Sequence, residues 1–391
     1  MGTGSIAFAF FLIFFGAAVL ATIALFTRQS LLVAYILLGI IVGPWGLKLI
    51  PHTQTINETS TIGIMFLLFL LGLNLQVKNL ISMLRGATII TIASTVTFTV
   101  IGMGVSRYFG FNWIDSVMIG VAVMFSSTII GLKLLPTTAL HHQHIGEVVV
   151  SVLLMQDIIA ILVLLVLNLW GAGSAHDYLI AIFRTLIAIP VLVLVAYFVE
   201  RYVLHKLFKK YDRIREYVFL LAIGWCLGMA ELGELFGVSL EIGAFIAGVA
   251  LASSPISQYI AESLKPLRDF FLVVFFFSVG AGFDFHVVPQ VLIFVCVMTL
   301  LVLLIKPLVF RVFSKVMQES SKTAWEIGWR LGQASEFSLL VGFLAYHTQV
   351  ITEGAYISIE AVTILTFIIS SYVIIMFFPS PLAIKAELRR D

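Results

Sequence analysis

The chain has 391 residues, of which 61% are hydrophobic and 11% are charged, and its net charge at pH 7 is +2. A soluble domain has about half apolar and about a quarter charged residues, so one soluble core could not bury this much apolar surface. The composition therefore excludes an ordinary soluble protein and predicts a lipid-embedded one. A net charge this close to zero gives no reason to expect a nucleic acid as a partner.

Thirteen apolar runs are long enough, or nearly long enough, to cross a bilayer as helices. A crossing takes about 17 to 25 residues of helix, which satisfies every backbone hydrogen bond. In chain order the predicted segments are 5–26, 30–49, 60–76, 86–107, 113–135, 147–170, 178–199, 217–235, 238–253, 269–284, 289–313, 324–347 and 354–378. The first lacks the basic start and the cleavage site of a signal peptide, so we expect a retained helix. The sequence thus predicts an all-α polytopic membrane protein.

Basic residues are concentrated in alternate connections between these segments. Of the 23 Lys and Arg residues, 18 follow odd-numbered segments, whereas connections such as "GAGSAHDY" and "HTQVITEG" carry none. Cytoplasmic loops of membrane proteins are enriched in Lys and Arg. We therefore expect the N-terminus outside, the C-terminus in the cytoplasm and a short cytoplasmic tail over 379–391.

The two halves of the chain share a weak repeat with an offset of about 210 residues. "SLLVAYILLGIIVGP" begins at Ser30 and "SLEIGAFIAGVALAS" at Ser239, and "GLNL" after segment three corresponds to "GFDF" after segment ten. Segments two and nine differ by an odd number of crossings, so the copies would run in opposite directions. Inverted repeats are typical of alternating-access transporters. We expect one transmembrane domain over 1–391, with repeat one over about 5–170, a linker helix over about 178–199 and repeat two over about 217–378.

Four charged side chains stand out inside apolar segments: Asp157, Lys306, Arg330 and Glu336. A charge at the bilayer centre costs about 2.5–3.5 kcal/mol even on lenient insertion scales, so such residues usually pair or serve a transport route. Asp157 lies about ten residues into its segment, near mid-depth. A carboxyl group there holds a cation when ionised and a proton when neutral. The alternative is a structural Asp that is hydrogen-bonded within the bundle.

The other three charges also have two interpretations each. Lys306 precedes Pro307, which should kink the helix, and could pair with Asp157 until a cation displaces it. A snorkelling or structural lysine is the alternative. Arg330 and Glu336 are six residues apart, so they can pair only across a helix break unless each has another partner. We expect all three to compensate charge.

Segments five and twelve contain unusually polar stretches, "MFSSTIIG" and "LGQASEFSLLVG". A repeat offset of 209 maps Ser126 onto Ser335 and Ser127 onto Glu336. Small and hydroxyl residues permit helix interruption, which frees backbone carbonyl groups to coordinate a cation. Hydroxyl-mediated helix packing is the alternative.

These stretches and segment six predict one site for a monovalent cation and a proton. Its expected members are Asp157, Gln156, Ser126, Ser127 and Thr128, with the cation at Asp157. Nucleotide-binding, zinc-binding and nucleophile motifs are absent from the sequence, so we expect a transporter without a cofactor rather than an enzyme.

Six stretches together resemble the Kef-type branch of the monovalent cation:proton antiporters, across essentially the whole chain. They are "GIIVGPWGLKLI", "FLLGLNL", "SSTIIG", "LLMQDIIAI", "GAFIAGVALASS" and "WRLGQASEFSLLVG". The resemblance implies a sodium/proton-antiporter-like fold of thirteen helices in two inverted repeats, with crossing discontinuous helices at segments five and twelve. Its ion-binding carboxylate corresponds to Asp157 and its membrane lysine to Lys306.

The resemblance also implies how such a protein moves and assembles. Segments four to six and eleven to thirteen would form an ion-carrying core that moves as an elevator. Segments one to three and eight to ten would form a dimerising scaffold, with segment seven as the link. A homodimer in the bacterial inner membrane, in contact with membrane lipid, is implied.

The residue before Asp157 bears on selectivity. Sodium exchangers of this wider fold often carry two adjacent acids where this chain has Gln156 and Asp157. A single titrating acid implies electroneutral exchange, unless Lys306 also exchanges its proton. The Gln–Asp pair is similar to that of potassium-handling members, so K⁺ and H⁺ are the expected substrates. An Na⁺/H⁺ antiporter, a gated K⁺ channel and a non-transporting sensor are the alternatives.

Full-length Kef proteins continue into a cytoplasmic nucleotide-binding regulatory domain, whereas this chain ends at Asp391. We therefore expect a regulatory domain or subunit, where one acts, to lie outside this chain. The loop "SSPISQYIAESLKPLRDF" differs from the acidic loop of glutathione-gated members, so we do not expect control by glutathione.

Overall fold

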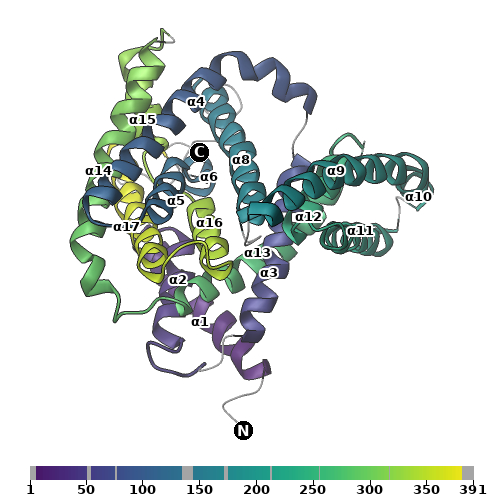
Figure 1. The fold of residues 1–391 in the computed structure, drawn as a ribbon, viewed down its shortest axis with the longest axis horizontal. Helices are drawn as coiled ribbons and strands as arrows, with labels where there is room; N and C mark the ends of the chain where they lie inside the picture. Colours follow the sequence, from purple (N-terminus) through teal and green to yellow (C-terminus); the bar gives the residue numbers. More distant parts are fainter. Residues whose placement is uncertain are drawn as a thin grey trace. The chain divides into compact units, whose positions relative to one another are not determined.

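The computed structural model describes residues 6–50, 54–74, 77–133, 144–170, 175–211, 214–254, 256–316 and 318–380, and the elements of these residues are all helices (Figure 1). The first half contains α1 (Ile6–Phe26), α2 (Leu31–Val42), α3 (Gln54–Asn74), α4 (Val77–Tyr108), α5 (Trp113–Met124), α6 (Thr128–Lys133), α8 (His144–Trp170) and α9 (Ala175–Val199). A π-helical turn, η1 (Glu200–Leu204), leads into α10 (His205–Tyr211). The second half contains α11 (Arg215–Leu235), α12 (Leu240–Ala252), α13 (Ser257–Ala281), α14 (Val288–Val316), α15 (Ser321–Arg330), α16 (Glu336–His347) and α17 (Glu353–Phe377).

Each of the predicted apolar segments coincides with a helix or with a pair of helices. Seven helices of the described residues are long and apolar enough to cross a membrane. The all-α fold class is confirmed, whereas the number of thirteen crossings stays a prediction. The predicted tail over 379–391 lies outside the described residues beyond Ser380.

Two predicted segments are interrupted where their polar stretches lie. Segment 113–135 splits into α5 and α6, and segment 324–347 splits into α15 and α16. The backbone after α5 is extended at Phe125, with φ −70° and ψ 147°. α16 begins after a Ser335 cap, whose hydroxyl oxygen accepts a hydrogen bond from the amide of Phe337. The first break covers residues 125–127 and the second covers residues 331–335. The repeat offset of 209 maps the first break onto 334–336, which overlaps the second.

Two helices begin well before the apolar runs that predicted them. α13 starts at Ser257 rather than near residue 269, because the stretch "SQYIAESLKPLR" is too polar for a hydropathy search to detect. α4 starts at Val77 for the same reason. The basic connection after segment seven is helical as far as Tyr211.

The helices group into two compact units. Unit 1 comprises residues 1–13, 50–81 and 164–278, and unit 2 comprises residues 14–49, 82–163 and 279–391. Segments four to six and eleven to thirteen, predicted as the ion-carrying core, fall mainly in unit 2. Most of α1 and all of α2 also fall in unit 2, whereas the resemblance grouped them with α3 and α11 to α13.

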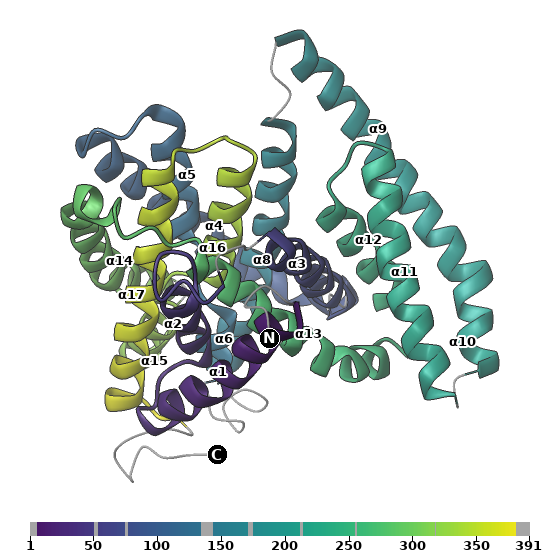
Figure 2. The same ribbon diagram turned by 90° about the horizontal axis from the view of Figure 1, so that it is seen from below.

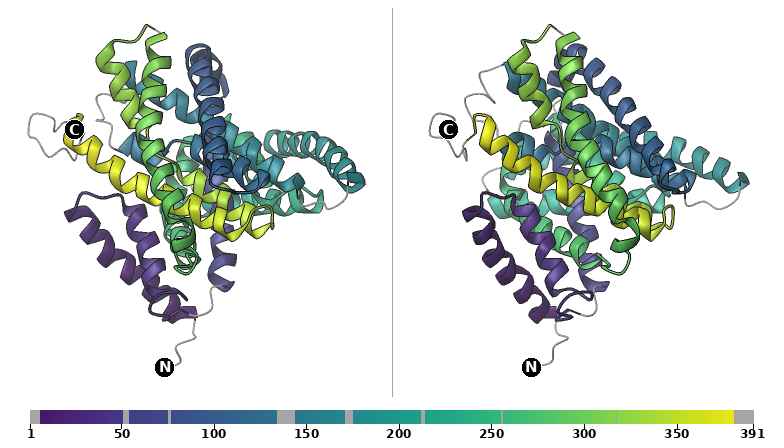
Figure 3. Two further views of the ribbon diagram at one scale, coloured as in Figure 1. Left: turned by 60° about the vertical axis from the view of Figure 1, so that its left-hand side comes forward. Right: turned by 90° about the vertical axis from the view of Figure 1, so that its left-hand side faces the viewer.

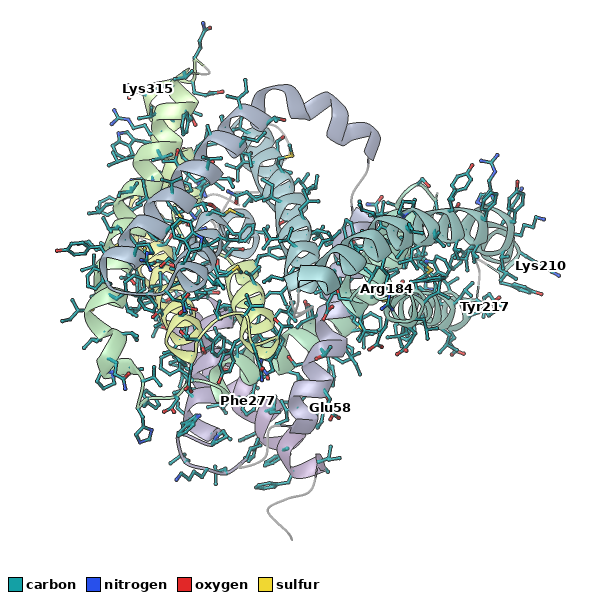
Figure 4. The ribbon with its side chains drawn as sticks, viewed as in Figure 1. Glu58, Arg184, Lys210, Tyr217, Phe277 and Lys315 are labelled. Carbon is teal, nitrogen blue, oxygen red and sulfur yellow. The ribbon has the colours of Figure 1, made fainter. Side chains whose placement is uncertain are left out.

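Unit 1 is built on an apolar core to which α3, α9, α11 and α12 contribute. α12 packs against α3 and α11, and Figure 2 shows α9 continuing into α10 alongside α11. Arg184 of α9, labelled in Figure 4, donates from Nε to the carbonyl oxygen of Phe236 at 2.8 Å. This bond ties α9 to the end of α11.

Unit 2 contains both helix breaks. α14 packs against α15 and α17, and α16 packs against α17 and α5. Figure 3 shows α17 (yellow) lying across α14 (green) in both views. The helices before and after each break therefore have neighbours that can hold their free ends.

Closely packed glycines give the two halves of the chain equivalent contacts. A Cβ added at Gly72 of α3 would lie 2.5 Å from the carbonyl oxygen of Phe245 in α12, and one added at Gly280 of α13 would overlap the carbonyl oxygen of Ile36 in α2. Phe245 follows Ile36 by 209 residues and Gly280 follows Gly72 by 208. A helix is thus closely packed at a glycine in each unit: α3 against α12 in unit 1, and the end of α13 against α2 in unit 2. These equivalent contacts support the repeat.

Candidate ion-binding site

The two helix breaks of unit 2 are joined by serine hydroxyl groups. Ser126 in the first break donates from Oγ to the carbonyl oxygen of Leu331 in the second, at 2.8 Å. Ser338 in the first turn of α16 donates to the carbonyl oxygen of Ala122 near the end of α5, at 2.6 Å. Both serines are buried. The breaks therefore form one site, although 205 residues separate Ser126 from Leu331 in the sequence.

Gln156 of α8 satisfies the backbone of the first break. Its Oε1 accepts a hydrogen bond from the amide of Ser126 at 2.8 Å, and its Nε2 donates to the carbonyl oxygen of Met124 at 3.4 Å. A helix interruption leaves such groups without intrahelical partners, and a buried unpaired group costs about 1–3 kcal/mol. Gln156 itself is buried. This predicted site residue thus has a structural role beside the carboxyl group of Asp157.

Lys306 of α14 connects both breaks through their carbonyl groups. Its Nζ donates to the carbonyl oxygen of Phe125 at 2.7 Å and to that of Gln333 at 2.9 Å, and it lies 5.2 Å from the ring centroid of Phe98. The two carbonyl groups follow the C-terminal ends of α5 and α15, so the ammonium group faces the negative ends of two helix dipoles. The ion pair with Asp157 that the sequence suggested is not formed within the described residues.

α17 contributes one partner to the backbone of the second break and one to the side chain of Gln333. The amide of Ala334 donates to Oγ1 of Thr366 at 3.2 Å, and Oγ of Ser370 donates to Oε1 of Gln333 at 3.1 Å. Nε2 of Gln333 donates to the carbonyl oxygen of Arg330 at 2.9 Å. Side chains from a neighbouring helix therefore stabilise this break, as Gln156 stabilises the first.

Asp157 follows Gln156 on α8, and 4% of its surface is exposed. Among the described residues, none donates a hydrogen bond to its carboxyl group. The charged group that acts on it is the carboxyl group of Glu336. Buried polar groups in proteins are normally hydrogen-bonded, so this geometry does not favour the interpretation of Asp157 as a structural residue held within the bundle.

Glu336 is the first residue of α16 and is buried. Its carboxylate accepts a hydrogen bond from Oγ1 of Thr128, the first residue of α6. The Ser127 hydroxyl oxygen accepts a hydrogen bond from the amide of Ile130 at 3.2 Å. The N-terminal end of a helix stabilises a carboxylate, so the start of α16 is a suitable place for Glu336.

Arg330 is fully buried, and its partner is Glu326 rather than Glu336. The guanidinium group donates from NH2 to Oε1 of Glu326 at 2.7 Å, one turn earlier in α15, and to the carbonyl oxygen of Pro379 at 2.6 Å. The sequence left open whether Arg330 and Glu336 pair with each other or with other groups. In the structure each has another partner.

Asp157 and Glu336 bring two buried carboxyl groups into one site. Two carboxylates in low-dielectric surroundings repel each other and have both lost their hydration, so the pair needs a counter-charge. A bound cation or a proton supplies it. The arrangement can therefore hold one or the other, with Lys306 withdrawn to the carbonyl groups of the breaks.

Three side chains of this region were not predicted from the sequence: Gln333, Thr366 and Glu360. Gln333 lies in a stretch already noted as polar, but its partners come from another helix. Thr366 carries no signal of its own in an apolar segment. Glu360 does carry one, because "YISIEAVTIL" contains an acid that a lipid-facing helix would not tolerate.

The profile of one protein family, described as "Sodium/hydrogen exchanger, transmembrane", matches residues 10–378. The match covers nearly the whole chain, including Asp157 and both helix breaks. The chain belongs to the sodium/hydrogen exchanger family.

Curated relatives place the chain in a narrower group of this family. It is 29% identical over 337 residues to the "Glutathione-regulated potassium-efflux system protein KefC" of Escherichia fergusonii, covering 84% of this chain and 54% of that protein. The KefC protein of Escherichia coli strain UTI89 / UPEC is 30% identical over 339 residues, with the same coverage. "K(+) efflux antiporter 5" of Arabidopsis thaliana is 26% identical over 379 residues, covering 92% of this chain and 64% of that protein. The chain spans about half the length of the KefC proteins it matches.

The fold of the exchanger is similar to that of a solved structure, the sodium proton antiporter MjNhaP1 from Methanocaldococcus jannaschii. The TM-score is 0.71 at 17% identity, over 94% of this chain and 95% of that chain. This likeness shows the fold alone, and it confirms the predicted sodium/proton-antiporter-like architecture. The resemblance to the Kef-type branch is also confirmed, and its members are multi-pass membrane transporters rather than enzymes.

Proposed function

We propose that the protein exchanges a monovalent cation, K⁺, for a proton across a membrane, and that Asp157 binds the two in turn. One observation carries the proposal. Asp157 is a buried carboxyl group that accepts no hydrogen bond from the described residues. It lies on α8, whose Gln156 supports the first of the two joined helix breaks. Transporters build ion sites at mid-membrane from discontinuous helices. Membership of the exchanger family supports the same activity.

The cation and the proton compete because each neutralises the same carboxylate. When the cation is bound, Asp157 is ionised, and we assign the further oxygen ligands to Gln156, Ser126, Ser127 and Thr128. When a proton binds instead, the carboxyl group is neutral and the cation leaves. Because the pair formed by Asp157 and Glu336 needs a counter-charge in either state, an empty, fully ionised site is disfavoured.

K⁺ is chosen over Na⁺ on two grounds. The bacterial relatives are named as potassium-efflux proteins, and Gln156 stands where sodium exchangers of this fold often carry a second acid. Na⁺/H⁺ exchange on the same fold is the alternative. Exchange in proteoliposomes with K⁺, Na⁺, Li⁺ and Rb⁺ across a range of pH distinguishes them.

The remaining charges set the stoichiometry. We assign Lys306 and Arg330 to charge compensation at the two breaks. Lys306 donates to one carbonyl oxygen in each break, and Arg330 donates to the carbonyl oxygen of Pro379, just after α17. The negative charge of Glu336 is itself stabilised by the hydroxyl group of Thr128 and the start of α16. With the proton of Lys306 retained, one cation leaves for one proton and the exchange is electroneutral.

Alternating access would come from movement of the part of unit 2 that carries the breaks, as an elevator. The equivalent glycine contacts support two inverted repeats, over about 5–170 and 217–378, linked by a helix over about 178–199. We further propose a homodimer in the bacterial inner membrane with the N-terminus outside and the C-terminus in the cytoplasm. Membrane lipid and a nucleotide-binding regulatory domain or subunit complete the proposed partners.

Asp157→Asn tests the assignment of the site. Asparagine has the same size but cannot ionise, so we expect cation-dependent proton flux in proteoliposomes to be lost, together with stabilisation of the protein by K⁺ against heat. Asp269→Asn is the matched control, because Asp269 is exposed and pairs with Arg268. Undiminished cation-dependent proton flux in Asp157→Asn, with the control active, would refute the proposal.

A gated K⁺ channel is the second candidate, favoured by the words "efflux system" in the names of the relatives. A channel passes K⁺ down its gradient without obligatory proton movement. Recording internal pH and K⁺ flux together separates the two, because only an antiporter moves protons against their gradient when K⁺ is supplied. A non-transporting sensor would show neither flux.

A further inference from the structure

α17 carries a buried polar stripe along most of its length. Its members are Tyr356, Glu360, Thr363, Thr366 and Ser370, at intervals of four, three, three and four residues. This spacing places them on one face of the helix. All five are at least 96% buried, so the stripe faces the interior of unit 2 rather than lipid.

Glu360 is the only acid of this stripe, and it is 0% exposed. Neither of its carboxyl oxygens has a hydrogen-bond partner within 3.5 Å among the described residues, and the side chain that acts on it is Tyr356, one turn earlier. An ionised carboxylate in such surroundings, unpaired, would cost many kcal/mol, so the group neutralises instead. A buried carboxyl group without a hydrogen-bond partner is thus suited to hold a proton.

Other charged and titratable groups on the helices around α17 have different partners. Lys306 of α14 is held by two carbonyl groups, Arg330 of α15 by Glu326, and Glu336 of α16 by Thr128. The further titratable residues are Cys296, Arg311 and Lys315 of α14, Lys322 of α15, Tyr346 and His347 of α16, Asp115 of α5, Tyr35 of α2, and Glu353 and Tyr372 of α17 itself. None of the described basic side chains forms an ion pair with Glu360.

One end of the stripe reaches the connection between α16 and α17. Tyr356 stacks on Tyr346, with ring centroids 4.9 Å apart and an interplanar angle of 5°. Tyr346 is partly exposed near the end of α16. Glu360 lies seven residues into α17, about 10 Å along the helix from its start. Tyr346 is thus a partly exposed residue in contact with the stripe at Tyr356, one helical turn of α17 from Glu360.

The other end of the stripe reaches the second helix break. Oγ1 of Thr366 accepts a hydrogen bond from the amide of Ala334, and Oγ of Ser370 donates to Oε1 of Gln333. The carbonyl oxygen of Gln333 in turn accepts from Lys306. The end of the stripe farthest from Tyr356 thus contacts the break that contributes to the ion site.

We propose that Glu360 is a second proton-binding residue of the exchange, reached from water past Tyr346 and Tyr356 and connected with the second break by the hydroxyl groups of α17. The carboxylate takes one proton from water on that side and later returns one proton, so the residue ends each cycle as it began. The proposal deepens the proposed antiport, on which it rests, by adding a proton site distinct from Asp157.

Glu360→Gln in the full-length chain tests the proposal, because glutamine keeps the size and the neutral state but cannot release a proton. We expect cation-driven proton flux in proteoliposomes to fall about tenfold or more and its pH dependence to flatten. Glu360→Asp should recover part of both. Stabilisation of the purified variant by K⁺ should be unchanged, because Asp157 is intact. Glu353→Gln, at an exposed acid in the first turn of the same helix, is the matched control.

Infrared difference spectra give a second readout that needs no transport. The C=O stretch of a protonated carboxyl group should be lost in Glu360→Gln and kept in Glu353→Gln. Wild-type flux and a wild-type pH profile in Glu360→Gln would overturn the proposal, as would an unchanged carboxyl band. If the unaltered protein moves no protons in response to cations, the antiport proposal fails instead, and the infrared band alone decides whether Glu360 binds a proton.

Discussion

Gly72→Ala should weaken the packing of α3 on α12. The added Cβ would lie 2.5 Å from the carbonyl oxygen of Phe245 and 2.9 Å from the amide nitrogen of Val249. Both neighbours are backbone atoms of α12, so no side chain can rotate to make room. The helices must separate by about 0.9 Å to restore an ordinary 3.4 Å contact.

The expected cost follows from that separation. A gap of about 0.5–1 Å forfeits a quarter to a half of the dispersion energy of each contact along the seam. Inserting a methyl group into a close-packed interface typically costs about 1–3 kcal/mol. Alanine recovers up to about 1 kcal/mol through its higher helix propensity. A net loss of about 1–2 kcal/mol in the free energy of unfolding is therefore expected.

Thermal unfolding of the purified protein in detergent measures this loss. Gly228→Ala in α11 is the matched control, because nothing lies within 4 Å of its added Cβ, and it should be neutral or stabilising. Gly280→Ala should destabilise as Gly72→Ala does, since its Cβ would meet the backbone of Ile36 at the equivalent contact. An unfolding temperature for Gly72→Ala equal to that of Gly228→Ala would show that the seam is not close-packed there.

Two further predictions concern the breaks. Lys306→Met leaves two buried carbonyl oxygens without a donor, so we expect the free energy of unfolding to fall by about 1–3 kcal/mol for each. The unfolding temperature should be lower, and Lys306→Gln should lose less stability than Lys306→Met. Equal stability of both variants with the unaltered protein would contradict this role. Gln156→Glu keeps an acceptor for the amide of Ser126 but adds a titrating group, so exchange should become sensitive to a membrane potential that is imposed on proteoliposomes without a K⁺ diffusion gradient. An equal response of the unaltered protein would argue against electroneutral exchange.

The amino-acid sequence was sufficient to predict the helices and the positions at which two of them break. Apolar runs of membrane-spanning length have only one way to satisfy their backbone, so the helices of the thirteen predicted segments follow from local composition. The helices of segments five and twelve are interrupted within their polar stretches, where hydroxyl and small residues lower the free-energy cost of an interruption. The predicted starts of α4 and α13 were too late in the chain, because the first turns of both helices are too polar to be distinguished from a loop by hydropathy.

The partners of the charged residues were decided only by tertiary structure. Sequence suggested Asp157 for Lys306, but the carbonyl groups of Phe125 and Gln333 hold it instead. Those carbonyl groups become available only once α5 and α15 end beside each other, more than 200 residues apart in the chain.

Sequence by itself determined that an acid sits in an apolar helix at Asp157, and it carried the same signal at Glu360. Only the fold decided which of their neighbours could pair with them. A hydropathy pattern records the cost of placing a charge in the membrane. The compensation of that charge depends on contacts between distant segments, such as Thr128 with Glu336 and Lys306 with the carbonyl group of Phe125, and these exist only in the folded chain.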